Sequence, residues 1–502
     1  MPSIFETDAA LDTLAATAIT QTKELMAQSE KLRDRREKAS RKRVARLFKD
    51  PKAIEATITL TDEVMRISSV QSSSRIFRRA AKKASLVGFG AVNALGLHFI
   101  GVLSRVVPGP IVGVVHQRVR ALSKDLILAS ESEKLAKHLA KRATKGISLN
   151  INVLGEAVLG DHEAEQRFQS ILEMMRRPEV NYISVKLSSI VAQLIIIDVD
   201  GSIDRVSEKM RILYRQAQEH GVFVNLDMEE YRDLPMTVAA FMRVLDEDEF
   251  AGMKAGIVLQ AYLPESHHFF GELVTWAKAR YEKSGGTIKV RLVKGANLAM
   301  ERAEAELHGW SAAPYRTKSD VDASYVRLVD AALRPEHAKA VRIGIASHNL
   351  FHMTWAIEVA KSRGVLEQID IEMLEGMANA EALAVTRAGQ PVLLYAPVTR
   401  KDDFAAAVAY LVRRLDENTS DENYLKAAFD IAKNPAKFAD QEQRFLKSIA
   451  ERHTITTETL RHVEHGQLTG LTFQNEANAD PTEPRFIASV EKAIKKVRGI
   501  TD

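Results

Sequence analysis

Two adjacent arginines carry the most specific chemistry in the chain. Arg413 and Arg414 lie within AYLVRRLDENT (409–419), whose apolar spacing otherwise predicts a packed helix. Neighbouring helical residues project about 100° apart, so both guanidinium groups can flank one point, with Tyr410 about one turn earlier on the same side. A planar guanidinium matches the two oxygens of a carboxylate, so the pair predicts a carboxylate-binding fork beside an aromatic wall. The alternative is an ion pair with a neighbouring acid such as Glu417.

Further polar residues share one feature, which is a position late in a short apolar run. They are Lys186, Asp227, Gln260, Arg291 with Lys294, His348 with Asn349, Glu372 with Glu375, and Tyr395. A single polar residue there often only marks where a strand leaves the core, but repetition over several runs favours a common site. Lys186 and Asp227 would be costly to bury without a partner or a ligand.

The runs that carry these residues alternate with amphipathic helical patterns. Eight runs occur, at 147–155, 182–188, 222–228, 256–262, 288–296, 341–349, 369–377 and 391–398. Eight strands with helices between them predict an α/β fold of the (β/α)8 TIM-barrel type, with an open doubly wound sheet as the alternative. Active residues of such a barrel lie at the C-terminal ends of its strands, where these polar residues fall.

The flanking segments differ in texture from this middle part. We predict a helical arm over 1–146, the barrel over 147–430 and a helical, partly irregular tail over 431–502. The chain has 502 residues, of which 46% are hydrophobic, so it can bury a large core. Its net charge of +4 is too small to create an overall positive potential that would attract nucleic acid. The chain has no cysteine, which excludes disulfides and thiolate sites, and no secretory signal pattern, so a cytoplasmic location is expected.

Several motifs occur in a fixed order along the middle part. They are KLS, NLDMEE, LQAY, VRLVKGA, SHN, LYAPV and YLVRRLDEN. In this order they closely resemble the proline dehydrogenase domain of the proline utilization A family. The resemblance implies an FAD-dependent (β/α)8 barrel that oxidises L-proline to Δ1-pyrroline-5-carboxylate, the first step of proline catabolism to glutamate. Hydride would pass to flavin N5, and the electrons would pass on to a quinone.

The same resemblance implies roles for individual residues. For the substrate, Lys186, Arg413 and Arg414 hold the carboxylate, Asp227 orients this cationic cluster, and Leu374, Tyr395 and Tyr410 enclose the ring. The implied flavin contacts are Gln260, Arg291, Val293, Lys294, Gly295, Ala296, Arg316, Thr317, Lys318, Ser347, His348, Asn349, Glu372 and Glu417. Gly295 and Ala296 would let the backbone approach the flavin closely.

The chain departs from the family pattern at two places. Asn297 and Leu298 follow KGA where the family usually has Tyr-Trp, and GMAN (376–379) replaces GMGE. The substrate alternatives are therefore proline, hydroxyproline or a related cyclic imino acid.

Two other functions compete with the dehydrogenase. A Schiff-base aldolase barrel would use Lys186 or Lys294 as its amine nucleophile, without flavin. A basic scaffold would bind DNA through residues 31–49, although a solvated helix face or a lipid contact explains that stretch better, and no nucleic acid is expected. The histidines in SHHFFGE and HVEH lack zinc-site order, so no metal is expected.

Residues 84–104 form a long uncharged stretch that follows basic residues at 78–83. It is interpreted either as a buried hairpin packed on the barrel or as an interfacial helix that makes peripheral contact with anionic lipid on the inner face of a membrane. We predict weak, salt-sensitive vesicle binding without insertion.

A segment near the end of the chain, FQNEANADP, resembles the link to an aldehyde dehydrogenase domain in bifunctional relatives. Such a domain or a partner would carry out the next step. That reaction needs a catalytic cysteine, so this chain alone is expected to produce no NADH from glutamate semialdehyde.

Overall fold

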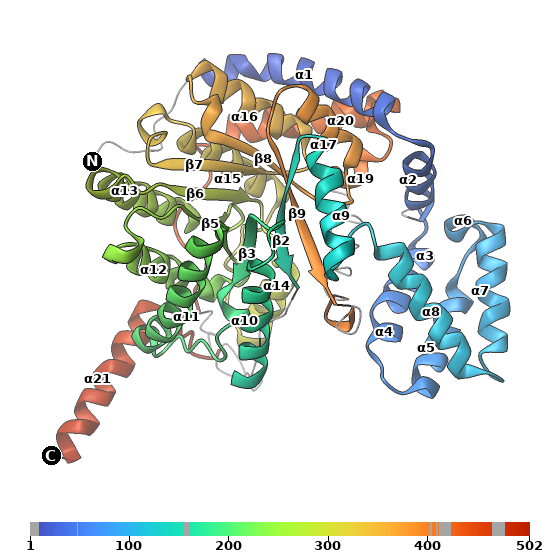
Figure 1. Ribbon diagram of the computed structural model, residues 1–502, viewed down its shortest axis with the longest axis horizontal. Coiled ribbons are helices and arrows are strands. Elements are labelled where there is room, and N and C mark those ends of the chain that lie inside the picture. Colours follow the sequence, from blue (N-terminus) through green and yellow to red (C-terminus); the bar gives the residue numbers. More distant parts are fainter. Residues whose placement is uncertain are drawn as a thin grey trace, which may run out of the picture.

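The computed structural model describes residues 10–47, 49–154, 158, 160–400, 404–407, 410, 423–463 and 477–501. Their centre is a closed barrel of parallel strands (Figure 1). Its strands are β2 (Ile147–Val153), β3 (Tyr182–Lys186), β4 (Phe223–Asp227), β5 (Ala255–Gln260), β6 (Ile288–Val293), β7 (Val341–Ala346), β8 (Ile369–Leu374) and β9 (Val392–Thr399). Each pairs with the next, and β9 pairs with both β8 and β2, which closes the ring. The predicted (β/α)8 barrel is confirmed.

The strands end earlier than several of the apolar runs. Lys294, His348 and Glu375 therefore lie in the loops that follow β6, β7 and β8 rather than within strands. The sheet also contains a two-residue strand, β1 (Leu128–Ala129), which pairs with β9. Two residues are too few to show a periodic pattern, and the sequence did not indicate this strand.

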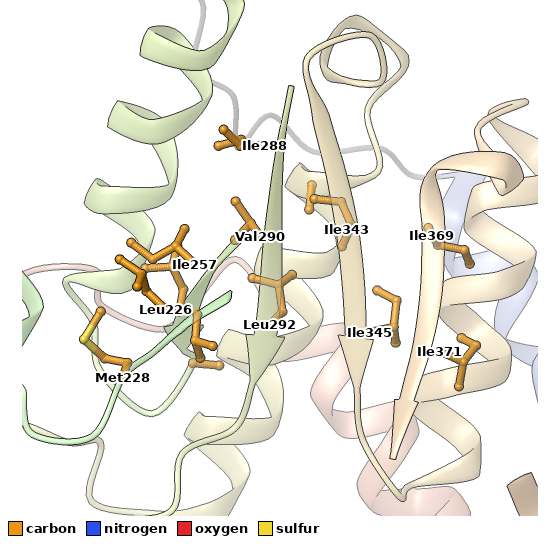
Figure 2. Packing of buried hydrophobic residues seen from close by; sticks show 14 of the residues in the cluster. Leu226, Met228, Ile257, Ile288, Val290, Leu292, Ile343, Ile345, Ile369 and Ile371 are labelled. Atoms are coloured by element: carbon orange, nitrogen blue, oxygen red, sulfur yellow. The ribbon is translucent and has the colours of Figure 1, made fainter. Parts of the chain in front are cut away.

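Alternation along the strands separates an apolar outer layer from a polar interior. In β6, Ile288, Val290 and Leu292 belong to the large apolar cluster, part of which Figure 2 shows. Lys289 and Arg291, on the opposite face, reach carboxylates of β8 and β4 across the barrel. Because side chains of a strand point alternately to its two faces, one short segment supplies both layers.

Helices cover the outside of the barrel. They are α10 (Asp161–Met175), α11 (Val199–His220), α12 (Leu234–Leu245), α13 (Ser266–Ser284), α14 (Leu298–His308), α15 (Lys318–Ala332), α16 (Leu350–Ser362) and α17 (Asn379–Arg387). The side chains of Thr317 and Asn349 cap α15 and α16 by accepting hydrogen bonds from backbone N–H groups of the first turn. Of the helix predicted over 409–419, the described residues include only Tyr410, and the turn Phe404–Ala407 precedes it.

The N-terminal helices form two parts. The long helix α1 (Ala10–Leu32) packs on α16 and α17. A lobe beside the barrel contains α2 (Arg35–Leu47), α3 (Pro51–Thr61), α4 (Glu63–Arg66), α5 (Val70–Lys83), α6 (Leu86–Phe89), α7 (Ala91–Leu103) and α8 (Pro108–Ser123) (Figure 1). Helix α9 (Ser132–Ala143) lies between this lobe and β2.

The C-terminal helices differ in how they are packed. Helices α19 (Tyr424–Ala428) and α20 (Pro435–Glu451) pack on the barrel layer, whereas α21 (Pro484–Thr501) projects away from it (Figure 1). Within the described parts of the chain, no helix is both long and apolar enough to cross a membrane.

The buried-hairpin interpretation of residues 84–104 is wrong. The segment forms α6, which contacts α2 and α3, and α7, which contacts α5 and α8, so its principal contacts lie within the lobe and not on the barrel. Its buried positions are few and small, such as Gly88, Ala94 and Gly101. Val92 remains 85% exposed and Phe99 70% exposed, because the lobe has only a small core of its own in which to bury them.

Candidate active site

A cavity of about 320 Å³ opens at the C-terminal ends of the barrel strands. Its described lining includes most of the predicted site residues, namely Lys186, Asp227, Gln260, Arg291, Val293, Lys294, Gly295, Ala296, Lys318, Ser347, His348, Asn349, Glu372, Leu374, Tyr395 and Tyr410. Arg316 and Thr317 are not among the described lining residues. Arg413, Arg414 and Glu417 lie outside the described residues.

A buried hydrogen-bond network centred on Asp227 crosses the barrel. The Asp227 carboxylate accepts hydrogen bonds from Nη2 of Arg291 at 2.6 Å, the hydroxyl of Tyr395 at 2.8 Å and Oγ of Ser184 at 2.9 Å. Burial, together with the negative charge of Asp227, raises the pKa of Tyr395 well above its usual value. The tyrosine therefore stays a protonated donor, and the network fixes its ring 5.1 Å from the Arg291 guanidinium.

A second buried group of charges, centred on Lys289, adjoins this network. Nζ of Lys289 lies 2.6 Å from Glu372 and 2.9 Å from Asp370. The Glu372 carboxylate in turn lies 3.7 Å from Arg291. Sequence reasoning missed Lys289, although its alternation with Arg291 along β6 was a usable signal.

Lys186 pairs with an acid that the sequence analysis did not consider. Its Nζ donates to Oε2 of Glu229 at 2.7 Å. Glu229 lies just after β4, and its carbonyl accepts a hydrogen bond from Nδ2 of Asn297 at 3.0 Å. Asp227 thus contacts Arg291, while the hydrogen-bonded acid at Lys186 is Glu229.

A cluster of cations surrounds Asp322 on another wall of the cavity. Nζ of Lys294 donates to Asp322 at 2.6 Å and lies 3.0 Å from Nδ1 of His352, and Lys318 also pairs with Asp322. Burial lowers the pKa of Lys294 to about 7, and the charge of Lys318 acts in the same direction. Burial also lowers the pKa of His352. One carboxylate therefore faces two lysines, and Lys294 releases its proton near neutral pH.

A side chain at position 295 would collide with a neighbouring residue of the protein. The φ of +120° at Gly295 lies in a region that side chains rarely adopt, and a Cβ there would lie 2.5 Å from the ring of Tyr262. His348 is also engaged within the protein, because its Nε2 accepts the backbone N–H of Leu374 at 3.1 Å. Its proton therefore lies on Nδ1 when the ring is neutral.

The cavity also has a wall outside the predicted barrel, because Gln441, Arg444 and Phe445 of α20 line it. Asn423, Tyr424 and Leu425, near the end of the predicted barrel segment, line it as well. Nε2 of His352 lies 3.2 Å from Oγ of Ser448 in α20, which ties this helix to the Lys294 cluster. Sequence reasoning assigned 431–502 to a separate tail, and helical periodicity gave no sign of this packing.

A barrel with such a cavity at the C-terminal ends of its strands is the architecture of a TIM-barrel enzyme. The sequence matches the proline dehydrogenase family over residues 135–427, and the chain belongs to this family. This membership favours the dehydrogenase over the aldolase and scaffold alternatives.

The chain is similar to part of several larger proteins. It is 23% identical over 334 residues to the bifunctional protein PutA of Klebsiella aerogenes, an alignment covering 63% of this chain and 25% of that protein. The chain thus spans about a quarter of this relative's length. The structure of proline utilization A from Corynebacterium freiburgense is 44% identical, with a TM-score of 0.66 over 75% of this chain and 36% of that one. That from Bdellovibrio bacteriovorus is 25% identical, with a TM-score of 0.78 over 97% and 49%.

Proposed function

We propose that this chain is an FAD-dependent proline dehydrogenase that oxidises L-proline to Δ1-pyrroline-5-carboxylate. The observation that carries the proposal is the convergence of family-motif residues from separate strands, including Lys186, Asp227 and Arg291, on one cavity. The barrel supplies fixed cations for a carboxylate beside an apolar and aromatic wall for a small ring.

The polar groups that line the cavity suit the binding of FAD. Oε1 of Gln260 is buried in the wall without a hydrogen-bond donor among the described residues, which suits an N–H of a flavin ring. Lys318 of α15 and Arg444 of α20 supply cations for phosphate groups. When bound, FAD supplies the acceptor for the hydride that leaves the ring carbon next to nitrogen.

The protein residues place the substrate. Lys186, with Arg413 and Arg414, holds the carboxylate, and the Lys186–Glu229 pair opens or is shared when that carboxylate binds. Leu374, Tyr395 and Tyr410 enclose the ring and exclude water.

The electrons pass to a quinone at a membrane surface, which the lobe contacts peripherally. Residues 64–124 contain no Asp or Glu, and apolar residues of α6–α8 are exposed, whereas the basic residues of this stretch lie mainly on α5 and α8. This composition suits anionic headgroups. The product passes to an aldehyde dehydrogenase domain or partner, of the kind that bifunctional relatives join to this unit.

Visible spectroscopy of the purified protein tests the proposal. We expect flavin absorbance that anaerobic L-proline bleaches, and comparison with hydroxyproline ranks the substrate alternatives. A colourless protein that binds no added FAD, and that borohydride with a carbonyl substrate traps covalently at Lys186 or Lys294, would replace the dehydrogenase by the aldolase.

A further inference from the structure

The cavity wall at the end of β8 is tied to other wall residues through its backbone. Leu374, the last residue of β8, lines the cavity and is followed by Glu375. The N–H of Leu374 donates to Nε2 of His348 at 3.1 Å, and the N–H of Glu375 donates to the carbonyl of Tyr395 at 2.9 Å. A displacement of Glu375 would therefore move this wall.

The side chain of Glu375 is fixed by α9, outside the barrel. The residue is 1% exposed, and its Oε1 accepts a hydrogen bond from Nη2 of Arg142. The same Nη2 lies 2.5 Å from Oδ1 of Asn379, and Nε2 of His138 lies 3.4 Å from Oε1 of Glu375. Because a buried carboxylate without a cation is strongly unfavourable, the position of Glu375 depends on Arg142.

The segment before α9 contacts the same wall. Gly376 has a φ of +80°, and a Cβ there would lie 1.9 Å from the backbone oxygen of Asp125. Ile127 packs in one apolar cluster with Tyr410, and Tyr395 packs against that cluster. Residues that precede the barrel in sequence thus support both sides of the wall.

We propose that Arg142 is a positioning residue for substrate binding. Through Glu375 it holds Leu374 and Tyr395 in the arrangement that closes on the substrate ring. Arg142 is 7% exposed and is not among the described residues that line the cavity, so it acts through the wall. The inference rests on the proposed function. Wall contacts bind the ground state and the transition state alike, so their loss raises KM and leaves kcat nearly unchanged.

A double-mutant cycle tests the inference. Arg142→Met and Leu374→Ala are made singly and together, and Lys141→Met, an exposed neighbour in α9, is the matched control. We expect each single variant to raise the KM for proline about 10-fold with flavin content retained, and the control to change nothing. The double variant should raise KM clearly less than the product of the two single effects, because part of the effect of Arg142 is exerted through Leu374.

Two outcomes would overturn the inference. One is a KM increase of about 100-fold in the double variant, the product of independent effects. The other is an unchanged KM in Arg142→Met together with a lower melting temperature, which would make the ion pair purely structural. If Arg142→Met does not fold, Arg142→Lys, which keeps the charge but loses the planar fork, carries the same cycle. Failure of the wild type to oxidise proline would instead overturn the proposed function.

Discussion

At the scale of residues, the described cations of the cavity are already matched by acids. Arg291 contacts Asp227, Lys186 contacts Glu229, and Lys294 shares Asp322 with Lys318. This pairing limits the cost of burying the charges before a ligand arrives. Lys186 must then share its partner with an added carboxylate, so we expect the fork predicted at 413–414 to contribute most to substrate affinity.

The fork is tested by replacing either arginine. Arg413→Met or Arg414→Met should remove a charge-assisted hydrogen bond worth about 1.5–3 kcal/mol and raise the KM for proline about 10–100-fold, with flavin retained. Arg400→Met is the control, because Arg400 forms an exposed pair with Glu173. Initial rates at varied proline concentration test this prediction. An unchanged KM in both variants would mean that the two arginines only form ion pairs with neighbouring acids and do not bind the substrate.

Lys294 predicts a specific dependence of stability on pH. Its pKa is about 7 in the folded protein, because of burial, and near 10.5 when unfolded. Between these values the unfolded chain binds more protons, so the free energy of unfolding of the flavin-free protein rises with pH, by at most about 1.4 kcal/mol per pH unit from this group. Lys294→Met should flatten the curve from pH 7 to 10 in denaturant titrations, whereas Lys141→Met should not. If the wild type and Lys294→Met gave parallel curves of stability against pH, the lowered pKa of Lys294 would be contradicted.

At the scale of elements, a glycine on β7 makes room in the barrel interior for an ion pair between β6 and β8. Gly344 of β7 lies between Lys289 and Glu372, and a Cβ there would lie 2.2 Å from Oε1 of Glu372. The missing side chain therefore leaves room for the buried ion pair of the neighbouring strands. Gly344→Ala should displace that pair.

Helix α14 carries a buried acid whose ionisation opposes folding. Glu301 accepts the backbone N–H of Tyr231 at 2.7 Å, and burial raises its pKa to about 7. Between about pH 4.5 and 7 the unfolded chain ionises while the folded protein does not, so stability falls across this window and the loss persists above it. Glu301→Gln keeps an acceptor and should raise the melting temperature above pH 7, but not below pH 4.5. Glu306→Gln, on an exposed position of α14, is the control, and an equal gain at both pH extremes would exclude this cause.

At the scale of the whole molecule, the lobe carries exposed apolar side chains and, over residues 64–124, basic but no acidic residues. Leu95, Phe99 and Val102 of α7 are exposed, as is Val106 beyond it. Exposed apolar residues gathered on one small lobe indicate an interaction surface, and the basic residues of α5 and α8 in the same lobe favour anionic lipid.

Vesicle flotation tests this surface. We expect weak binding to anionic vesicles at low salt, loss of binding at high salt, and stronger binding after reduction by proline. Val92→Asp with Phe99→Asp should abolish binding while leaving flavin content unchanged, because both side chains are largely exposed. No association of the wild type in either redox state would remove the lipid interpretation, and resistance to carbonate extraction would mean insertion rather than peripheral contact.

The sequence by itself determined the barrel and much of its cavity. Each apolar run is local, and its residues fall on one of two faces, so the strand count and the positions of Lys186, Asp227 and Arg291 follow from short-range patterns. Motif order then indicated the family. Strand ends were less certain, because the pattern continues past the last paired residue, as at Lys294.

Only the tertiary structure decided which distant groups meet. Asp322 on α15, Arg142 on α9 and Arg444 on α20 reach the site or its wall from segments whose own sequences read as ordinary helices. A helix shows in its sequence which face is apolar, but not which partner covers that face. For the same reason the sequence left open whether 84–104 was buried, and the packing of α7 on a small lobe settled that its apolar residues face outward.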